Sequence, residues 1–117
     1  MLTSKEIAHL AVKALDDKIA RDIQILKTDK VTVLADYFIL CTAGNSTHGK
    51  TLADEVDKVL SQAGEQPLRR EGYRSGGWTL LDFGCVVVHI FSEEMRSFYS
   101  LDRLWSDAEK IDYKDFL

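Results

Sequence analysis

The sequence predicts an α/β domain in which helices pack on a mixed β-sheet, in the order α-β-β-α-β-β-α over residues 1–117. Three observations support this prediction. Stretches with apolar residues at helical spacing alternate with short runs rich in β-branched and aromatic residues, turn residues separate the stretches, and 117 residues suffice for one hydrophobic core but not for two. A hairpin that follows a helix crossing from an earlier strand gives the sheet both parallel and antiparallel neighbours. We therefore expect a single domain.

The first helix is expected to begin at Thr3 and to end near Lys18. Thr3 and Glu6 have the spacing of a capping box, in which each side chain binds the backbone N–H of the other residue. The apolar residues that follow recur on one helical face: Ile7, Leu10, Ala11, Ala14 and Leu15. A short β-favouring run follows at residues 23–26, and residues 36–42 are nearly all apolar. The second run predicts a strand that is buried on both faces.

A second helix is expected in the middle of the chain. Asn45, Ser46 or Thr47 can cap its first turn. Its apolar face would consist of Leu52, Val56, Val59, Leu60 and Ala63. Gly64 can end the helix in the left-handed conformation, and Pro67 cannot continue it.

The second half of the chain predicts a hairpin and a final helix. Residues 65–77 contain three Gly, one Pro and three Arg, so we expect an exposed connection that could include a short extended piece. Residues 78–83 and 85–91 are β-rich runs that meet at a tight antiparallel turn around Gly84. The remainder, from Ser92 onward, is expected to be helical.

The charge distribution favours a protein partner. The formal net charge is −4, and residues 92–117 carry seven acids against four bases, whereas residues 1–91 are nearly balanced. An acidic surface repels phosphate backbones and steers basic proteins toward it. Nucleic-acid phosphates are therefore not expected to be the main anchor of a complex.

The N-terminus and the cysteines indicate a cytoplasmic protein. Residues 1–18 carry charges throughout and lack both a long apolar core and a cleavage site, so neither a signal peptide nor a membrane span is expected. Cys41 and Cys85 lie in apolar runs without CxxC spacing, which favours reduced and buried side chains over a disulfide.

No motif predicts a catalytic, metal or cofactor site. Gly44, Asn45 and Ser46 lie where a phosphate could rest on a helix start, but the other residues of a phosphate loop are missing. A nucleotidyltransferase would also need two carboxylates on the following strand to hold magnesium, and Asp82 stands alone in this sequence. The three histidines are scattered and form no metal-ligand motif: His9, His48 and His89.

The aromatic residues point instead to a contact surface. In the first hairpin strand, alternation places Trp78, Leu80 and Asp82 on one face and a second set of largely apolar residues on the other. One face must pack on helices, and the other is covered by the C-terminal helix or left open for a partner. Tyr99 and Trp105 add large side chains near two bases, Arg96 and Arg103. Trp, Tyr and Arg dominate protein interfaces, although these aromatics could equally complete the core.

Stretches spread over nearly the whole chain form one pattern: residues 35–42 (ADYFILCT), 45–46, 52–54, 71–72, 77–78, 81–84, 86–91 and 96–105 (RSFYSLDRLW). Together they resemble the ribosomal silencing factor family, also called Iojap-related. The resemblance implies a nucleotidyltransferase-like fold without catalytic activity, and binding to the large ribosomal subunit through ribosomal protein L-fourteen at the subunit-joining face. A protein on that face would prevent the small subunit from docking and reduce translation when nutrients are scarce.

The resemblance also assigns partner-binding residues, which fall on the side chains that the aromatic pattern selects: Trp78, Leu80, Asp82, Arg96, Tyr99 and Trp105. The chain departs from the family pattern at Cys85, where Asp is usual after the turn glycine, and at Gly49, where a bulkier residue is usual. Glycine at the second position would weaken the helix by about 1 kcal/mol relative to Ala.

Other functions remain open on the sequence alone. Homodimerisation is implied for some members of the family, and it would compete with the ribosome if both used one sheet face. An RNA-binding module is an alternative, because Arg69, Arg70 and Arg74 cluster in one connection, where they could also make a secondary contact to ribosomal RNA or simply solvate a loop. An enzyme of nucleotidyltransferase type is a second alternative, which magnesium-dependent nucleotide binding would support. Steric repression itself requires no cofactor.

Overall fold

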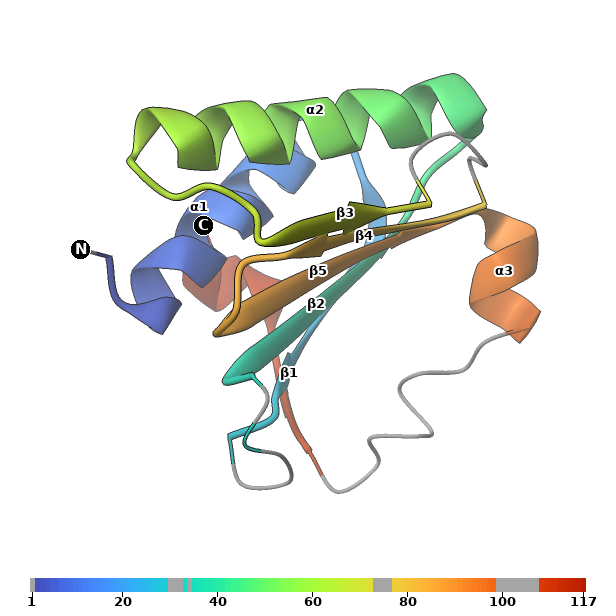
Figure 1. Cartoon of the computed structure of the whole chain (residues 1–117). Coiled ribbons are helices and arrows are strands. Elements are labelled where there is room, and N and C mark those ends of the chain that lie inside the picture. The colour runs from blue at the N-terminus through green and yellow to red at the C-terminus, as the bar shows by residue number, and fades with distance from the viewer. Residues whose placement is uncertain (1, 30–32, 34, 73–76, 99–107) are drawn as a thin grey trace.

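A six-stranded sheet with two long helices on one face forms the computed structural model (Figure 1). The structure describes residues 2–29, 33, 35–72, 77–98 and 108–117. Within these residues the elements follow in the order α1 (Ser4–Asp17), β1 (Arg21–Lys27), β2 (Tyr37–Thr42), α2 (Ser46–Gln62), β3 (Arg69–Glu71), β4 (Trp78–Asp82), β5 (Val86–Phe91), α3 (Glu93–Phe98), β6 (Glu109–Ile111) and the 3-10 helix η1 (Tyr113–Phe116).

The sheet is mixed, as the sequence predicts. Its strands lie in the order β3-β4-β5-β2-β1-β6. The central pair, β2 and β5, is parallel, and every other neighbouring pair is antiparallel. The connection between β2 and β5 contains α2, because parallel neighbours need a crossover. The mixed α/β fold is therefore confirmed, whereas the nucleotidyltransferase-like label stays a prediction.

Local capping fixes where both long helices begin. In α1 the Thr3 hydroxyl accepts a hydrogen bond from the Glu6 backbone at 3.1 Å, and the Glu6 carboxylate accepts one from the Thr3 backbone at 3.0 Å. In α2 the Asn45 side chain accepts a hydrogen bond from the His48 backbone at 2.8 Å. Each bond satisfies a donor that the first helical turn leaves unpaired. The predicted helix starts are confirmed.

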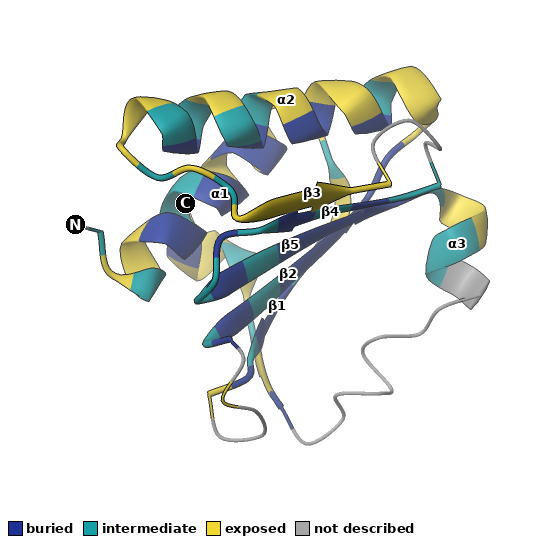
Figure 2. Cartoon of the chain, in the orientation of Figure 1, coloured by how far each residue is buried: buried dark blue, intermediate teal, exposed yellow. Residues whose placement is uncertain are grey.

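The main core lies between the sheet and the helices α1 and α2 (Figure 2). Alternate residues of the strands point into it: Ile25, Ile39, Cys41, Leu81, Val88 and Ile90. The helices contribute the face that their periodicity predicts, including Leu15, Leu52 and Leu60, each with no exposed surface. Residues of β2 are buried on both faces except Phe38, which is half-buried. That strand agrees with the predicted central strand.

The C-terminal prediction is wrong in its last part. A helix is present at Glu93–Phe98, but β6 and η1 follow where the sequence predicts helix. Two long-range contacts override the helical tendency. Ile111 pairs with Ile25 at the edge of the sheet, and the Phe116 ring packs edge-on against Tyr37 at 5.6 Å.

Two smaller expectations are also corrected or refined. The connection at residues 65–77 contains β3, the short extended piece that the sequence left open. Cys41 is fully buried as expected, but Cys85 is only half-buried because it follows the hairpin turn. No helix in the described ranges is both long and apolar enough to cross a membrane.

Replacing Gly49 by Ala should stabilise the protein by about 0.5–1 kcal/mol, because glycine inside a helix costs that much in backbone entropy. The position accepts a methyl group, since a Cβ there would lie 3.6 Å from the Cβ of Ala43, an ordinary contact. Gly64→Ala is the matched control, because its φ of +94° disfavours any side chain. In urea denaturation followed by circular dichroism, the midpoint should be higher for Gly49→Ala and lower for Gly64→Ala than for the wild-type protein. An unchanged or lower midpoint for Gly49→Ala would contradict the packing.

Candidate functional site

The sheet face that α1 and α2 leave uncovered carries an apolar patch, which we call the outer-face patch. Its members come from the adjacent strands β2, β5 and β4: Phe38, Val87, His89, Phe91, Trp78 and Leu80. Strand alternation turns these side chains away from the two long helices. The register joins them, since Trp78 lies opposite Phe91 and Leu80 lies opposite His89. Trp78, Leu80 and Asp82 share this face, as the alternation predicts.

Trp78 is fixed by two aromatic neighbours. Its ring stacks on Phe91, with centroids 5.1 Å apart and planes 30° apart. Its indole N–H donates a hydrogen bond of 3.1 Å to Nδ1 of His89. Phe38 also contacts the His89 ring, with centroids 5.2 Å apart. Phe91 has no exposed surface, whereas Trp78 and Phe38 are only half-buried, so these two rings present the aromatic area of the patch to a partner.

His89 is the buried polar centre of the patch. Only 5% of the residue is exposed. Burial lowers the pKa of its imidazole to about 4, and the nearby Asp82 carboxylate opposes this shift only partly. The ring is therefore neutral at physiological pH, and its proton lies on Nε2 because Nδ1 accepts the hydrogen bond from Trp78. Nε2 is buried and has no hydrogen-bond partner among the described residues.

Asp82 already has two structural partners at the edge of the patch. One carboxylate oxygen accepts a hydrogen bond from the Gly84 backbone at 2.8 Å, which stabilises the hairpin turn. The other accepts two from Arg69, at 3.3 and 3.2 Å. The side chain of Asp82 is 17% exposed. Its free surface for a partner is therefore small.

The arginines of β3 are paired with carboxylates rather than free. Arg69 contacts Glu71 at 3.5 Å in addition to Asp82. Arg70 points to the other face and bridges β3 to α2, contacting Asp57 at 2.6 Å and Asp54 at 3.5 Å. Such pairing reduces the positive field that a nucleic-acid phosphate would meet. Arg74, the third arginine of the predicted RNA-binding cluster, lies outside the described residues.

Arg96 lies on α3 and is bound to β2 and β1, not to the strand β4 that carries Trp78. Its guanidinium donates to the Thr42 hydroxyl at 3.1 Å and to the Asp22 carbonyl at 3.2 Å. These bonds attach α3 to β2 and β1. Trp78, Leu80 and Asp82 thus lie together on β4, whereas Arg96 is bound at β2 and β1. The predicted contacts Tyr99 and Trp105 lie outside the described residues.

Sequence reasoning missed the half of the patch that β2 and β5 supply. Phe38, His89 and Phe91 belong to runs that read as buried strand, and the sequence does not reveal that β5 lies between β2 and β4. A usable signal was present in residues 86–91. Alternation there places His89 and Phe91 on one face, as it does Trp78 and Leu80.

The start of α2 has geometry unlike that of a phosphate site. The Gly44 backbone N–H donates to the His48 side chain at 2.8 Å, so that donor is already used. A pocket of about 370 Å³ beside it is lined by Glu93 and Glu94, whose carboxylates repel phosphate.

Burial raises the pKa of the Cys41 thiol to about 12, which makes it a poor nucleophile. Within the described ranges no three His, Cys, Asp or Glu residues are grouped to hold a metal ion.

Comparison with known proteins identifies one family. The family model described as "Ribosomal silencing factor during starvation" matches residues 1–117. The chain is 36% identical over 111 residues to the ribosomal silencing factor RsfS of Bacillus subtilis, covering 95% of this chain and 94% of that protein. It is 35% identical over 111 residues to RsfS of Halalkalibacterium halodurans, covering 95% of both chains. The chloroplastic protein Iojap of Zea mays is 31% identical, with 86% of this chain and 43% of that protein covered.

Solved structures agree with this match. A crystal structure of a Chromobacterium violaceum protein superposes with a TM-score of 0.87 at 37% identity, covering 90% of this chain and 88% of that one. A Bacillus halodurans crystal structure gives a TM-score of 0.79 at 34% identity, with 88% and 93% covered. The fold of about nine-tenths of the chain is thus also that of solved protein structures.

His89 should make the fold sensitive to acid. Its pKa is lowered from 6.5 to about 4, so the unfolded chain takes up a proton before the folded one does as pH falls. The free energy of unfolding should keep its full contribution from His89 above pH 6.5 and lose it as the pH falls to 4. This loss is about 3 kcal/mol, and no more is lost below pH 4. Urea denaturation between pH 7 and pH 4 measures it.

His89→Asn is the matched control for this measurement. The amide oxygen can still accept a hydrogen bond from Trp78, but the side chain does not titrate. Its free energy of unfolding should fall less than that of the wild-type protein over the same pH range. Parallel curves for the two proteins would show that His89 does not cause the acid sensitivity.

Proposed function

Because this chain belongs to the ribosomal silencing factor family, it is a translation regulator, and we propose that it represses translation by binding the large ribosomal subunit through ribosomal protein L-fourteen. Bound there, the domain would block joining of the small subunit by its bulk alone. The observation that carries the proposal is the outer-face patch, in which the half-buried Trp78, Phe38 and Leu80 present apolar area.

The aromatic order of the patch suits a protein interface. Binding immobilises side chains, which costs about 0.5–1.5 kcal/mol for each flexible one. Trp78 avoids most of that cost, because Phe91 and His89 already fix its ring. Leu80 is half-buried beside it and adds apolar area. Aromatic residues in such a setting commonly become the energetic centre of an interface.

The charge near the C-terminus supports a basic partner. The described acids of this segment are all exposed: Glu93, Glu94, Glu109, Asp112 and Asp115. Opposite charge on a partner would accelerate encounter and favour one orientation. Tyr99 and Trp105 are part of the proposed contact as well, on the strength of the family pattern alone. Arg96 and Asp82 would act less directly, since each is engaged within the domain.

The remaining parts of the proposal concern other partners. A homodimer that used the outer-face patch would compete with the ribosome, since the patch cannot contact both at once. A secondary contact to ribosomal RNA through Arg69 and Arg70 is the weaker element, because both already pair with carboxylates. No turnover or cofactor is needed for a steric repressor. The protein would act in the cytoplasm, where ribosomal subunits join.

Sedimentation of purified subunits on a sucrose gradient tests the proposal. Wild-type protein should travel with the large subunit and reduce the peak of joined ribosomes. Trp78→Ala should weaken association about thirtyfold, because truncating an aromatic centre of an interface costs about 2 kcal/mol. Leu80→Arg should weaken it as well, since it places a positive charge against a basic partner.

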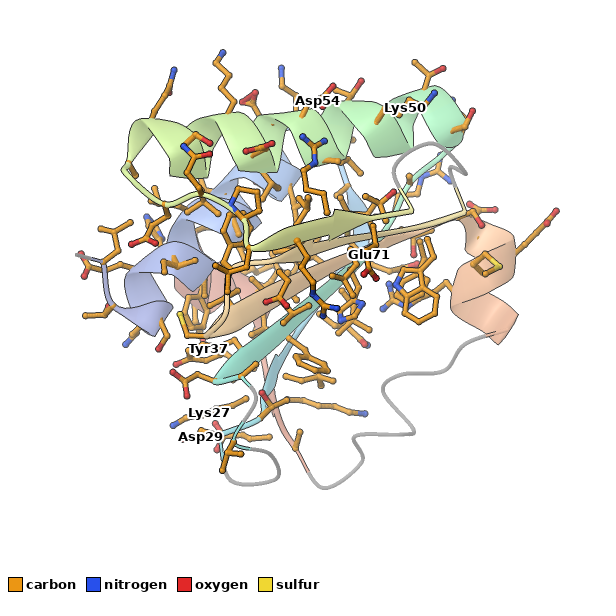
Figure 3. All side chains as sticks on the ribbon, in the orientation of Figure 1. Lys27, Asp29, Tyr37, Lys50, Asp54 and Glu71 are labelled. Carbon is orange, nitrogen blue, oxygen red and sulfur yellow. The ribbon has the colours of Figure 1, made fainter. Side chains whose placement is uncertain are left out.

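Lys50→Ala is the matched control, because Lys50 is exposed on α2, on the opposite side of the sheet (Figure 3). It should behave as the wild-type protein does, and circular dichroism should show that all variants are folded. If Lys50→Ala and Leu80→Arg bind equally well, the outer-face patch is not the contact. If the wild-type protein stays at the top of the gradient, ribosome binding itself is refuted.

A further inference from the structure

A small pocket lies at the edge of the outer-face patch, between β3 and β4. Its volume is about 280 Å³, and it is lined by Glu71, Gly72, Trp78 and Leu80. Pockets that hold drug-sized molecules commonly measure about 300–1,000 Å³, so this one is of a size for a single side chain. Two of its walls are apolar side chains of the outer-face patch, and a carboxylate forms another.

Strand register places the three side chains of the pocket on one face of the sheet. Glu71 lies directly opposite Leu80 in the antiparallel pair of β3 and β4, and Trp78 is two residues from Leu80 on the same strand. Opposite residues in such a pair, and residues two apart in a strand, point to the same side. Figure 3 shows Glu71 on the side of β3 that faces away from α2. The carboxylate and the two apolar side chains therefore open to the same space.

Gly72 brings the end of β3 close to the backbone of Trp78. Its φ is +76°, and a Cβ at this position would overlap the carbonyl oxygen of Trp78. A side chain would thus be strained by the backbone conformation and would collide with a main-chain atom. Glycine permits the close approach, which holds the neighbouring Glu71 beside the strand that carries the indole ring.

The carboxylate of Glu71 is accessible and only loosely engaged. Its side chain is 59% exposed, and its ion pair within the described chain joins Oε1 to Arg69 at 3.5 Å. Arg69 makes its shorter bonds to Asp82, at 3.3 and 3.2 Å. On this face β3 and β4 thus present two described carboxylates and one guanidinium, so negative charge is in excess. A positively charged group of a partner is attracted there.

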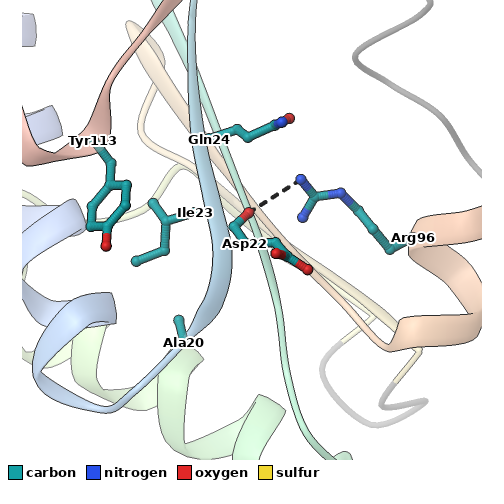
Figure 4. Close-up of a pocket in the computed structure, with 6 residues that line it drawn as sticks. All are labelled: Ala20, Asp22, Ile23, Gln24, Arg96 and Tyr113. Atoms are coloured by element: carbon teal, nitrogen blue, oxygen red, sulfur yellow. Dashed lines mark hydrogen bonds between the residues drawn. The ribbon is translucent and has the colours of Figure 1, made fainter.

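Two larger pockets are less suited to a cation. The pocket at the start of β1 measures about 490 Å³ and is lined by Ala20, Asp22, Ile23, Gln24, Arg96 and Tyr113 (Figure 4). The Arg96 guanidinium, which donates to the Asp22 carbonyl at 3.2 Å, repels a basic side chain there. The pocket of about 370 Å³ beside α2 contains Glu93, which is already paired with Arg21 at 2.7 Å, and its described lining includes no aromatic ring.

We propose that the pocket between β3 and β4 receives an arginine side chain of a protein partner. The inference rests on the proposed function, in which the outer-face patch is the contact surface. The methylene stem would lie against Leu80, and the guanidinium would stack on the exposed part of the Trp78 ring and donate to the Glu71 carboxylate. Arginine suits this site better than lysine, because a planar guanidinium stacks on an aromatic ring and binds a carboxylate at the same time. An apolar side chain would remove water from the carboxylate without replacing its hydrogen bonds.

Nuclear magnetic resonance with a short peptide tests the pocket without a ribosome. The probes are the tripeptide alanine-arginine-alanine, acetylated and amidated at its ends, and the same peptide with norleucine in place of arginine. The arginine peptide should shift the indole N–H resonance of Trp78, which Trp78→Phe removes and so assigns, with saturation at millimolar concentration. The norleucine peptide should bind about fivefold more weakly, since it lacks the charge. Absence of a saturable shift up to about 50 mM, or equal binding of the two peptides, overturns the proposal.

Glu71→Gln assigns the binding to the carboxylate. The variant keeps the size of the side chain and removes its charge, so the arginine peptide should bind it about fivefold more weakly than the wild-type protein. Asp17→Asn is the matched control, because Asp17 is an exposed carboxylate in the last turn of α1 that does not line the pocket. Equal affinity of the arginine peptide for Glu71→Gln and Asp17→Asn, with both folded by circular dichroism, overturns the proposal.

Sedimentation with the large ribosomal subunit separates this inference from the proposed function. Glu71→Gln should associate about fivefold more weakly than the wild-type protein, and the difference should shrink as salt screens the charges. If the wild-type protein binds the subunit and Glu71→Gln binds as tightly as Asp17→Asn, the inference fails while the proposed function stands. If the wild-type protein does not bind the subunit although the arginine peptide binds the pocket, the proposed function fails and the inference stands for a different protein partner.

Discussion

The parallel pairing of β2 with β5 is the constraint on which the rest of the structure depends. It runs in register from Tyr37 opposite Val86 to Thr42 opposite Phe91. Parallel neighbours require a crossover, so α2 must pass over one face of the sheet, where it packs beside α1. Both long helices therefore cover the same face. The other face carries a smaller buried cluster that includes Leu40 and Phe91, and the partly buried Phe38 and Trp78 pack against it. Those two rings keep part of their surface available to a partner.

A buried histidine gives that other face its order. An all-apolar patch could pack in several ways, whereas the hydrogen bond from Trp78 to His89 selects one ring orientation. The cost is the loss of water around the imidazole, which appears as its lowered pKa. The buried His89 thus orients the Trp78 ring, and it also makes the folded domain less stable in acid. Proteins commonly accept such a loss of stability at residues that serve function.

The sequence predicts those elements whose residues interact with near neighbours, and it fails where distant contacts decide. Capping by Thr3 and Asn45 is local, so both helix starts follow from the sequence. Strand β6 has three residues, two of them exposed and charged, and forms by pairing with the distant strand β1, where Ile111 lies opposite Ile25. The mixed sheet could be inferred from element order. Its strand order, which joins Phe38 to Trp78 through His89, could not.

The sequence also does not show which charged side chains are paired with each other in the folded domain. Counting acids and bases gives a net charge of −4 but not which charges are paired. Arg69 and Arg70 look available in the sequence, yet carboxylates from β4 and α2 engage them. Arg96, in contrast, donates to the Asp22 carbonyl and to the Thr42 hydroxyl rather than to a carboxylate. Since an unpaired charge can give a ligand more binding energy than one already engaged, pairing decides which charged groups can bind.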